Sequence, residues 1–186
     1  MASSQREEIP ITNEGMGQPL SATNQVLTAG AAVTQCLLYD SDEPTARLIG
    51  IEYMITPKLY DTLSKDERKL WHSHAYEVKS GMLIMPNRAV PESAWEVAEN
   101  MEMDQVVQLY GKVYHLWQTD RGDMLPLGPP KLMTSFTADG QLDFKHVRDR
   151  DRRFGVDHKQ KREARKDIPV PAIHEGKLSQ LRVELK

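Results

Sequence analysis

The sequence predicts a single-domain α+β protein with a mostly antiparallel sheet and one or two packed helices. The first observation is a nearly continuous apolar run over residues 47–55, which predicts a strand buried on both faces. The second is a set of apolar residues at helical spacing after Pro91, which predicts a long helix that ends at Gly111. The third is the order of the other elements, because short strands around one or two helical segments are typical of the α+β class.

The elements around the buried strand follow from local signals. Residues 25–35 predict a short apolar helix, and residues 36–39 predict a strand that a turn joins to the buried strand. Thr56, which a proline follows, is predicted to cap a short helix. Ser64 begins a capping-box pattern and is predicted to start a second helix.

The second half of the chain is read in the same way. A hairpin, the long helix and two further strands are expected in turn, at residues 75–85, 91–111, 113–117 and 131–136. The hairpin turn falls at Ser80-Gly81. From Asp149 onward charged residues dominate, and such a run is usually a solvated helix or tail.

These elements predict three parts along the 186 residues. Residues 1–24 are polar, contain prolines and glycines, and are expected to be a flexible N-terminal tail. Residues 25–160 are expected to be the domain, and residues 161–186 a charged C-terminal tail.

Composition narrows the classes of function. A net charge of −3 gives no electrostatic reason to bind nucleic acid. The single cysteine, Cys36, excludes an internal disulfide and fits a reducing compartment. The first residues lack the basic and apolar regions of a signal peptide. No apolar stretch approaches the roughly 18 residues that span a bilayer, so a soluble protein, or one attached to a membrane surface, is expected.

A pair of histidines is the strongest chemical signal in the sequence. His72 and His74 point to the same face if their segment is extended, because strand side chains repeat every two residues. With Glu77 and His115 they form a candidate ligand set for a divalent metal ion such as zinc, iron, copper or manganese. The alternative is that both imidazoles hydrogen-bond neighbouring backbone groups or carboxylates and fix a turn.

Other catalytic signals are few. Glu52 is a carboxylate inside the apolar run, and a buried carboxylate needs a partner, so Glu52 is expected to pair with an arginine or to be functional. The sequence contains no Gly-x-Ser-x-Gly elbow, no Walker A loop and no dinucleotide-binding fingerprint.

Aromatic residues offer a different kind of site. They are expected to belong to the core, and they would also suit a pocket for a lipid-like ligand. The residues concerned are Trp71, Tyr76, Trp95, Tyr114 and Trp117.

Several segments together resemble one family, the oil body-associated proteins, first described as a domain of unknown function. The matching segments lie at residues 39–44, 47–55, 70–86, 115–123, 125–130 and 153–157. They cover roughly residues 25–160 and include the histidine pair. The family pattern also has a stretch rich in His, Cys and aromatic residues before the position of Cys36, whereas here Gln35 leads directly into Cys36.

The resemblance implies a non-enzymatic protein that associates with the surface of lipid droplets and supports their size and stability. The expected location is the droplet surface and the cytoplasm, and the expected partners are the droplet surface or droplet proteins. Attachment would come from an amphipathic or apolar patch, or through a partner protein. The family provides no catalytic residue to transfer. The alternative function is a metal-dependent enzyme or sensor that uses His72, His74 and Glu77.

Overall fold

The computed structural model describes residues 11–12, 23–25, 33–87, 89–118, 122–133 and 135–172. Within them, seven strands form one sheet in the order β1-β7-β6-β4-β3-β2, and β5 also pairs with β6. All these strand pairs are antiparallel except the pair of β1 with β7. The strands are β1 (Ile11–Thr12), β2 (Thr23–Gln25), β3 (Val33–Tyr39), β4 (Leu48–Ile55), β5 (His72–Ser73), β6 (Tyr110–His115) and β7 (Lys131–Met133).

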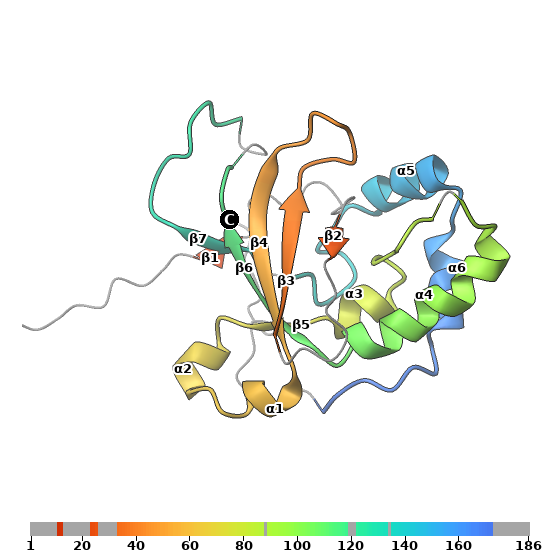
Figure 1. The fold of residues 1–186 in the computed structure, drawn as a ribbon, viewed down its shortest axis with the longest axis horizontal. Helices are drawn as coiled ribbons and strands as arrows, with labels where there is room; N and C mark the ends of the chain where they lie inside the picture. Colours follow the sequence, from red (N-terminus) through yellow and green to blue (C-terminus); the bar gives the residue numbers. More distant parts are fainter. Residues whose placement is uncertain are drawn as a thin grey trace, which may run out of the picture.

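Six helices accompany the sheet in the described part of the chain. They are α1 (Pro57–Tyr60), α2 (Lys65–Arg68), α3 (Ala75–Lys79), α4 (Glu92–Val106), α5 (Phe144–Phe154) and α6 (His158–Ala164). Helices α3 to α6 gather on one side of the molecule, and α1 and α2 lie at one end of the sheet (Figure 1). The predicted α+β class is confirmed, although the helices are more numerous than expected.

The structure confirms both helix caps that the sequence predicts. The Thr56 side chain accepts a hydrogen bond from the backbone N–H of Leu59 at 3.5 Å and starts α1. The Ser64 side chain accepts one from the backbone N–H of Glu67 at 3.2 Å and starts α2. These hydrogen bonds depend only on residues three apart in the sequence, which explains why the sequence predicts them.

The hairpin expected at residues 75–85 is wrong, because residues 75–79 form helix α3. Ala75 and Val78 are three positions apart and share one face of that helix. Both pack in one buried cluster with Met103, Val106 and Val107, at and just beyond the end of α4. The period of the buried residues is therefore helical, and it places α3 against α4.

Two other predictions at element boundaries are wrong. Gln25 lies in β2 and residues 33–35 lie in β3, while the middle of the expected helix over 25–35 is outside the described residues. Strand β3 alternates exposed and buried residues, which favours a sheet. Helix α4 ends at Val106 rather than at Gly111, because Gly111 belongs to β6 and pairs with Met54 of β4.

The apolar core also has a part on the sheet, in addition to the cluster between α3 and α4 described above. Leu38, Ile49, Val113 and Met133 form the buried cluster of the strands. At the end of the sheet the Tyr60 ring stacks on that of Tyr110, with 3.8 Å between ring centroids, and so holds α1 in place.

The charged C-terminal run is not uniformly solvated. Helix α6 crosses the expected domain end at residue 160, and Lys161 and Arg165 are buried, so the expectation of a solvated tail is wrong for these two residues. Both side chains make ion pairs with Glu99 of α4, which is also buried. The tail expected at residues 1–24 lies mostly outside the described residues, which include β1 and the start of β2 in that range.

Candidate functional site

The buried face of strand β4 carries the carboxylate of the candidate site. Glu52 is opposite Cys36 on β3 and opposite Val113 on β6, so all three side chains lie on the same face of the sheet. Only 8% of Glu52 is exposed, which makes it a carboxylate that requires partners.

Two imidazoles are those partners. The Nε2 atoms of His72 and His74 lie 3.1 Å and 3.2 Å from the same oxygen, Oε1 of Glu52. His72 is held by the pairing of β5 with β6, and His74 is the N-cap residue, directly before the first residue of α3. The Nδ1 atom of His74 donates to the carbonyl oxygen of Leu109 at 3.0 Å, so this nitrogen carries a proton and the ring orientation is fixed.

Gly111 makes the space for this cluster. A Cβ atom at this position would lie 2.6 Å from Nε2 of His72, 2.9 Å from Cε1 of His74 and closer still to Oε1 of Glu52. Because Gly111 has no side chain, the side chains of Glu52, His72 and His74 can meet over the backbone of β6 at this residue. The sequence points to Gly111 only as a helix end, and nothing local distinguishes the two roles.

The charges in the centre stabilise one another. Burial raises the pKa of the Glu52 carboxyl, but hydrogen bonds from His72 and His74 outweigh burial and hold this pKa well below its usual value. Burial lowers the pKa of His74, but the Glu52 carboxylate outweighs it and raises this pKa to about 9. At neutral pH the centre without a metal therefore holds a carboxylate and at least one imidazolium.

The expected ligand set needs a correction. The structure brings His72 and His74 together, but their carboxylate is Glu52, and neither Glu77 nor His115 belongs to this group within the described residues. Glu77 lies on α3 and acts on the centre only through its charge, which helps to raise the pKa of His74. His115 is buried at the end of β6, opposite Gly50.

Cys36 lies beside the centre and is expected to be inert in the folded protein. It has no exposed surface, and burial, together with the negative charge of Glu52, raises the pKa of its thiol to about 12. A thiol-reactive disulfide reagent at pH 8 should therefore label the native protein at least about 100 times more slowly than the protein in concentrated urea. Fast labelling of the native protein would contradict this burial.

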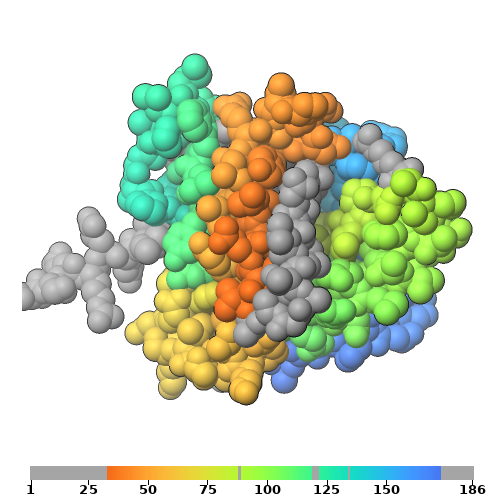
Figure 2. Space-filling model, viewed as in Figure 1, coloured from red at the N-terminus to blue at the C-terminus, as the bar shows by residue number. Residues whose placement is uncertain are grey.

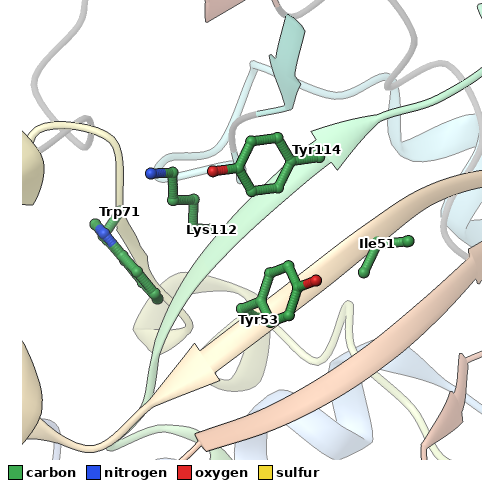
Figure 3. Close-up of a pocket in the computed structure, with 5 residues that line it drawn as sticks. All are labelled: Ile51, Tyr53, Trp71, Lys112 and Tyr114. Atoms are coloured by element: carbon green, nitrogen blue, oxygen red, sulfur yellow. The ribbon is translucent and has the colours of Figure 1, made fainter. Parts of the chain in front are cut away.

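The opposite face of the same strands carries an aromatic hollow of about 450 Å³. Its lining comes from Ile51 and Tyr53 on β4, Lys112 and Tyr114 on β6, and Trp71 just before β5 (Figure 3). The Nζ atom of Lys112 lies 5.8 Å from the Trp71 ring centroid and 5.4 Å from that of Tyr114. The same atom donates a hydrogen bond to Glu67 at 2.7 Å, so the cation is already paired.

The expected aromatic set is only partly assembled there. Trp71 and Tyr114 line the hollow. The other three, Tyr76, Trp95 and Trp117, make hydrogen bonds outside it. The hydroxyl of Tyr76 donates to Asp139 at 2.7 Å, and the indole of Trp117 donates to the carbonyl of Asp123 at 3.0 Å. The indole of Trp95 donates to the carbonyl of Met85 at 2.5 Å. A pocket for a lipid-like ligand stays a prediction.

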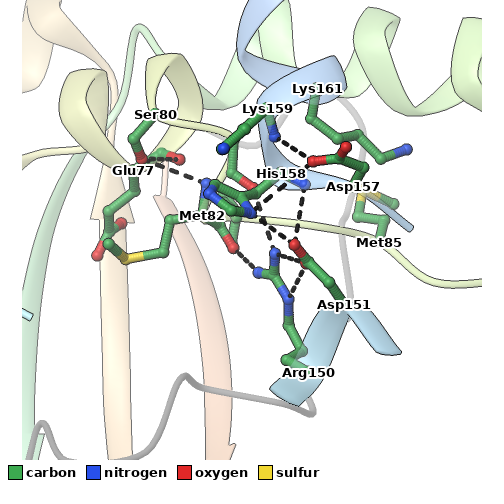
Figure 4. A network of polar contacts seen from close by, with 12 residues as sticks. Glu77, Ser80, Met82, Met85, Arg150, Asp151, Asp157, His158, Lys159 and Lys161 are labelled. Atoms are coloured by element: carbon green, nitrogen blue, oxygen red, sulfur yellow. Dashed lines mark hydrogen bonds and ion pairs between the residues drawn. The ribbon is translucent and has the colours of Figure 1, made fainter. Parts of the chain in front are cut away.

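A second group of possible ligands has a structural role. Asp151, Asp157 and His158 lie close together at the junction of α5 and α6 (Figure 4). The Asp151 carboxylate accepts from the Arg150 guanidinium and from Nδ1 of His158, both at 2.6 Å. Asp157 caps α6 by accepting from the backbone N–H of Lys159 at 2.8 Å. Arg150 already provides the cation that balances this group.

Fold and site together define a small α+β protein in which one mostly antiparallel sheet carries a buried histidine–glutamate centre on one face and an aromatic hollow on the other. The chain belongs to the family described as Protein of unknown function (DUF1264), whose sequence profile matches residues 9–169.

Curated relatives have names that agree with the motif resemblance. Oil body-associated protein 1B of Arabidopsis thaliana is 43% identical over 139 residues, which cover 75% of this chain and 55% of that protein. Oil body-associated protein 2A of Zea mays is 44% identical over 140 residues, 74% of this chain and 53% of that protein. Oil body-associated protein 1A of Zea mays is 40% identical over 158 residues, 85% of this chain and 64% of that protein. The chain thus spans about half the length of the first two of these relatives, and no solved structure matches it.

Proposed function

We propose that this protein associates with the surface of oil bodies and supports their stability without catalysing a reaction. The observation that carries the proposal is the family, because the relatives described above are named oil body-associated proteins. None of the helices in the described part of the chain is both long and apolar enough to cross a bilayer. We propose that the protein attaches to oil bodies through the surface of its fold and that unattached protein is in the cytoplasm.

An exposed loop is our candidate for the contact with lipid. The apolar loop (residues 122–130) lies between β6 and β7 in the chain and stands out from the sheet, away from helices α3 to α6 (Figures 1 and 2). Met124, Leu125 and Leu127 in it are 86%, 62% and 55% exposed. Leu116, just after β6, is also exposed. A lipid monolayer would bury these side chains, and each buried side chain contributes about 2 kcal/mol.

The loop is built to present these side chains without folding back. Pro126, Pro129 and Pro130 restrict its backbone. At its base the indole of Trp117 donates to the carbonyl of Asp123, and the backbone N–H of Asp123 donates to the carbonyl of Gln118 at 3.4 Å. Little conformational entropy is then lost when the loop enters a lipid surface.

Flotation of purified protein with triolein droplets coated with phosphatidylcholine tests the proposal. We expect the protein to rise with the droplets and to slow their coalescence. Protein that stays wholly in the aqueous fraction and leaves droplet growth unchanged would contradict the function.

Serine substitutions test the loop separately. The triple variant Met124→Ser, Leu125→Ser and Leu127→Ser should reduce the floated fraction at least about tenfold, because the apolar area that enters the monolayer is lost. The control replaces Val97 and Met101 by serine, since both are 66% exposed but lie on α4. Equal flotation of the triple variant and the control would exclude the loop as the contact and leave droplet association to another surface.

A metal-dependent enzyme or sensor is the second candidate function. The convergence of His72, His74 and Glu52 favours it, because these groups meet in a buried position. Droplet stabilisation by a folded Glu52→Gln variant separates the two candidates. The first candidate predicts that the wild type and the Glu52→Gln variant stabilise droplets equally, whereas the second predicts that purified protein, wild type or variant, has no direct effect on droplet stability.

A further inference from the structure

We infer that Glu52, His72 and His74 form a binding site for one divalent transition-metal ion, with Zn²⁺ as the best-fitting ion. The inference does not depend on droplet association, and it is the premise of the second candidate function. Two neutral imidazoles and one carboxylate are donors that Zn²⁺ takes readily, and three protein ligands leave one position open for water or another ligand.

The spacing of the donor atoms supports this site. Ligands at about 2.0–2.1 Å from a tetrahedral zinc ion lie about 3.3 Å from one another. The two nitrogen-to-oxygen distances are 3.1 Å and 3.2 Å, and all three donor atoms lie within 4.8 Å of one another. Small side-chain rotations therefore suffice to place an ion between them.

The surroundings hold the ligands in place. The hydrogen bond from Nδ1 of His74 to the Leu109 carbonyl leaves Nε2 directed at Glu52, and such an outer contact is typical of metal-binding histidines. The Nδ1 atom of His72 is buried and has no hydrogen-bond partner among the described residues. Among the described residues, Glu52 is therefore the only hydrogen-bond partner of the His72 ring, and a metal ion would hold the ring more strongly than one hydrogen bond does.

The buried Glu52 carboxylate favours a positive charge beside it. Nδ1 of His74 already donates to the Leu109 carbonyl, so a hydrogen bond from Nε2 of the same ring to Glu52 requires a second proton and a positive charge on His74. A proton on His74 provides that charge in the metal-free protein, and a divalent ion would replace it. Gly111 leaves room at this point because no Cβ atom projects toward the cluster.

Comparison with the second acidic group sharpens the assignment. Asp151 is already paired with the guanidinium of Arg150 at 2.6 Å, and Asp157 is half exposed and caps α6. A metal ion there would have to displace a buried arginine, which is costly. We therefore expect the Glu52 centre to bind a metal ion and the Asp151 group not to bind one, so a substitution of Asp157 provides a matched control.

Metal binding is measured on the full chain after chelation and return of Zn²⁺. We expect about one ion per chain by elemental analysis. The variants His72→Asn and His74→Asn should each weaken binding at least about 100-fold, because loss of an outer contact alone weakens metal sites by 10–100-fold. The controls His115→Asn and Asp157→Asn should bind as the wild type does, and asparagine keeps the helix cap at position 157.

A measurement without variants covers the case in which a variant fails to fold. X-ray absorption at the zinc edge of the wild-type protein should show nitrogen and oxygen ligands with imidazole scattering and no sulfur. A sulfur ligand would place Cys36 in the site and overturn the assignment. The assignment also fails if the wild type binds no zinc, or if Asp157→Asn or His115→Asn, but not His74→Asn, loses it.

Discussion

Replacement of Glu99 by alanine is expected to destabilise the protein by about 4 kcal/mol, the largest effect of any single substitution proposed for this chain. Glu99 is 1% exposed, and its Oε2 atom lies 2.5 Å from Nζ of Lys161 and 3.1 Å from a guanidinium nitrogen of Arg165. Its Oε1 atom accepts from the backbone N–H of Met85 at 2.7 Å. The alanine variant keeps both cations buried but removes the carboxylate that they share, and it leaves the Met85 N–H without its acceptor.

The stability of the cations depends on that carboxylate. Burial lowers the pKa of Lys161, but hydrogen bonds to Glu92 and Glu99 outweigh burial and raise this pKa above its usual value. Burial lowers the pKa of Arg165, and Glu99 opposes this effect. Without Glu99 the buried guanidinium would remain charged, because arginine does not lose its proton in proteins, and neutral acceptors such as the carbonyl oxygens of Val78 and Leu83 would replace the carboxylate.

Thermal unfolding and urea unfolding measure the effect. A loss of about 4 kcal/mol lowers the melting temperature by roughly 8–16 °C in a chain of this size. Glu92→Ala is the matched control, because Glu92 also pairs with Lys161 but its side chain is 41% exposed, and such pairs contribute at most about 1 kcal/mol. If Glu99→Ala and Glu92→Ala lowered the free energy of unfolding equally, burial would not determine how much these ion pairs contribute to stability.

Gly111→Ala is expected to be the second most damaging substitution, at about 3 kcal/mol, and to abolish the histidine–glutamate centre. The new methyl group would lie 2.6 Å from Nε2 of His72 and would collide with Oε1 of Glu52. The two side chains cannot both retreat, because one belongs to the central strand β4 and the other to β5, which pairs with Gly111 itself. The alanine loses less chain entropy on folding, but that gain is below about 1 kcal/mol.

Gly50→Ala on β4 separates crowding from the general effect of a glycine in a sheet. The nearest atom there is Cε of Met133 at 2.8 Å, the flexible end of a methionine side chain. The Gly50 variant should therefore lose less stability than the Gly111 variant in the same urea titration. A ranking in the opposite order would mean that the centre tolerates displacement, and the argument for a tightly held ligand cluster would fail.

The sequence predicts those parts of the fold that depend on neighbouring residues. The caps at Thr56 and Ser64 and the strand β4 follow from local patterns, and the structure confirms them. The expected burial of β4 on both faces is wrong, because Ile51 and Tyr53 are only partly buried and line the aromatic hollow. The hairpin expected at residues 75–85 fails because Ala75 and Val78 bury their side chains against α4, a contact that a local pattern does not contain. The tertiary contact with α4 outweighs the local sequence pattern of residues 75–85.

The candidate site shows the same limit. His72 and His74 are recognised from their spacing and do converge, but the carboxylate that joins them is 20 and 22 residues earlier in the sequence. Glu52 is noticed as a buried carboxylate, yet its match with the histidines depends on how β4, β5 and β6 align. The role of Gly111 depends on the three side chains that lie over its backbone. Each missed role is a relation between elements, and one sequence does not specify the register of distant strands.

The buried ion pairs that Glu99 makes with Lys161 of α6 and with Arg165 just after it also have a consequence for folding. Lys161 lies 62 residues after Glu99, so during synthesis α4 emerges well before the cations that it must pair with. Until then the Glu99 carboxylate can remain hydrated, and burying it would be unfavourable. The contact between α4 and α3 can therefore close fully only when α6 arrives. We therefore expect the helical half of the domain to pack completely only after the C-terminal part of the chain has been synthesised.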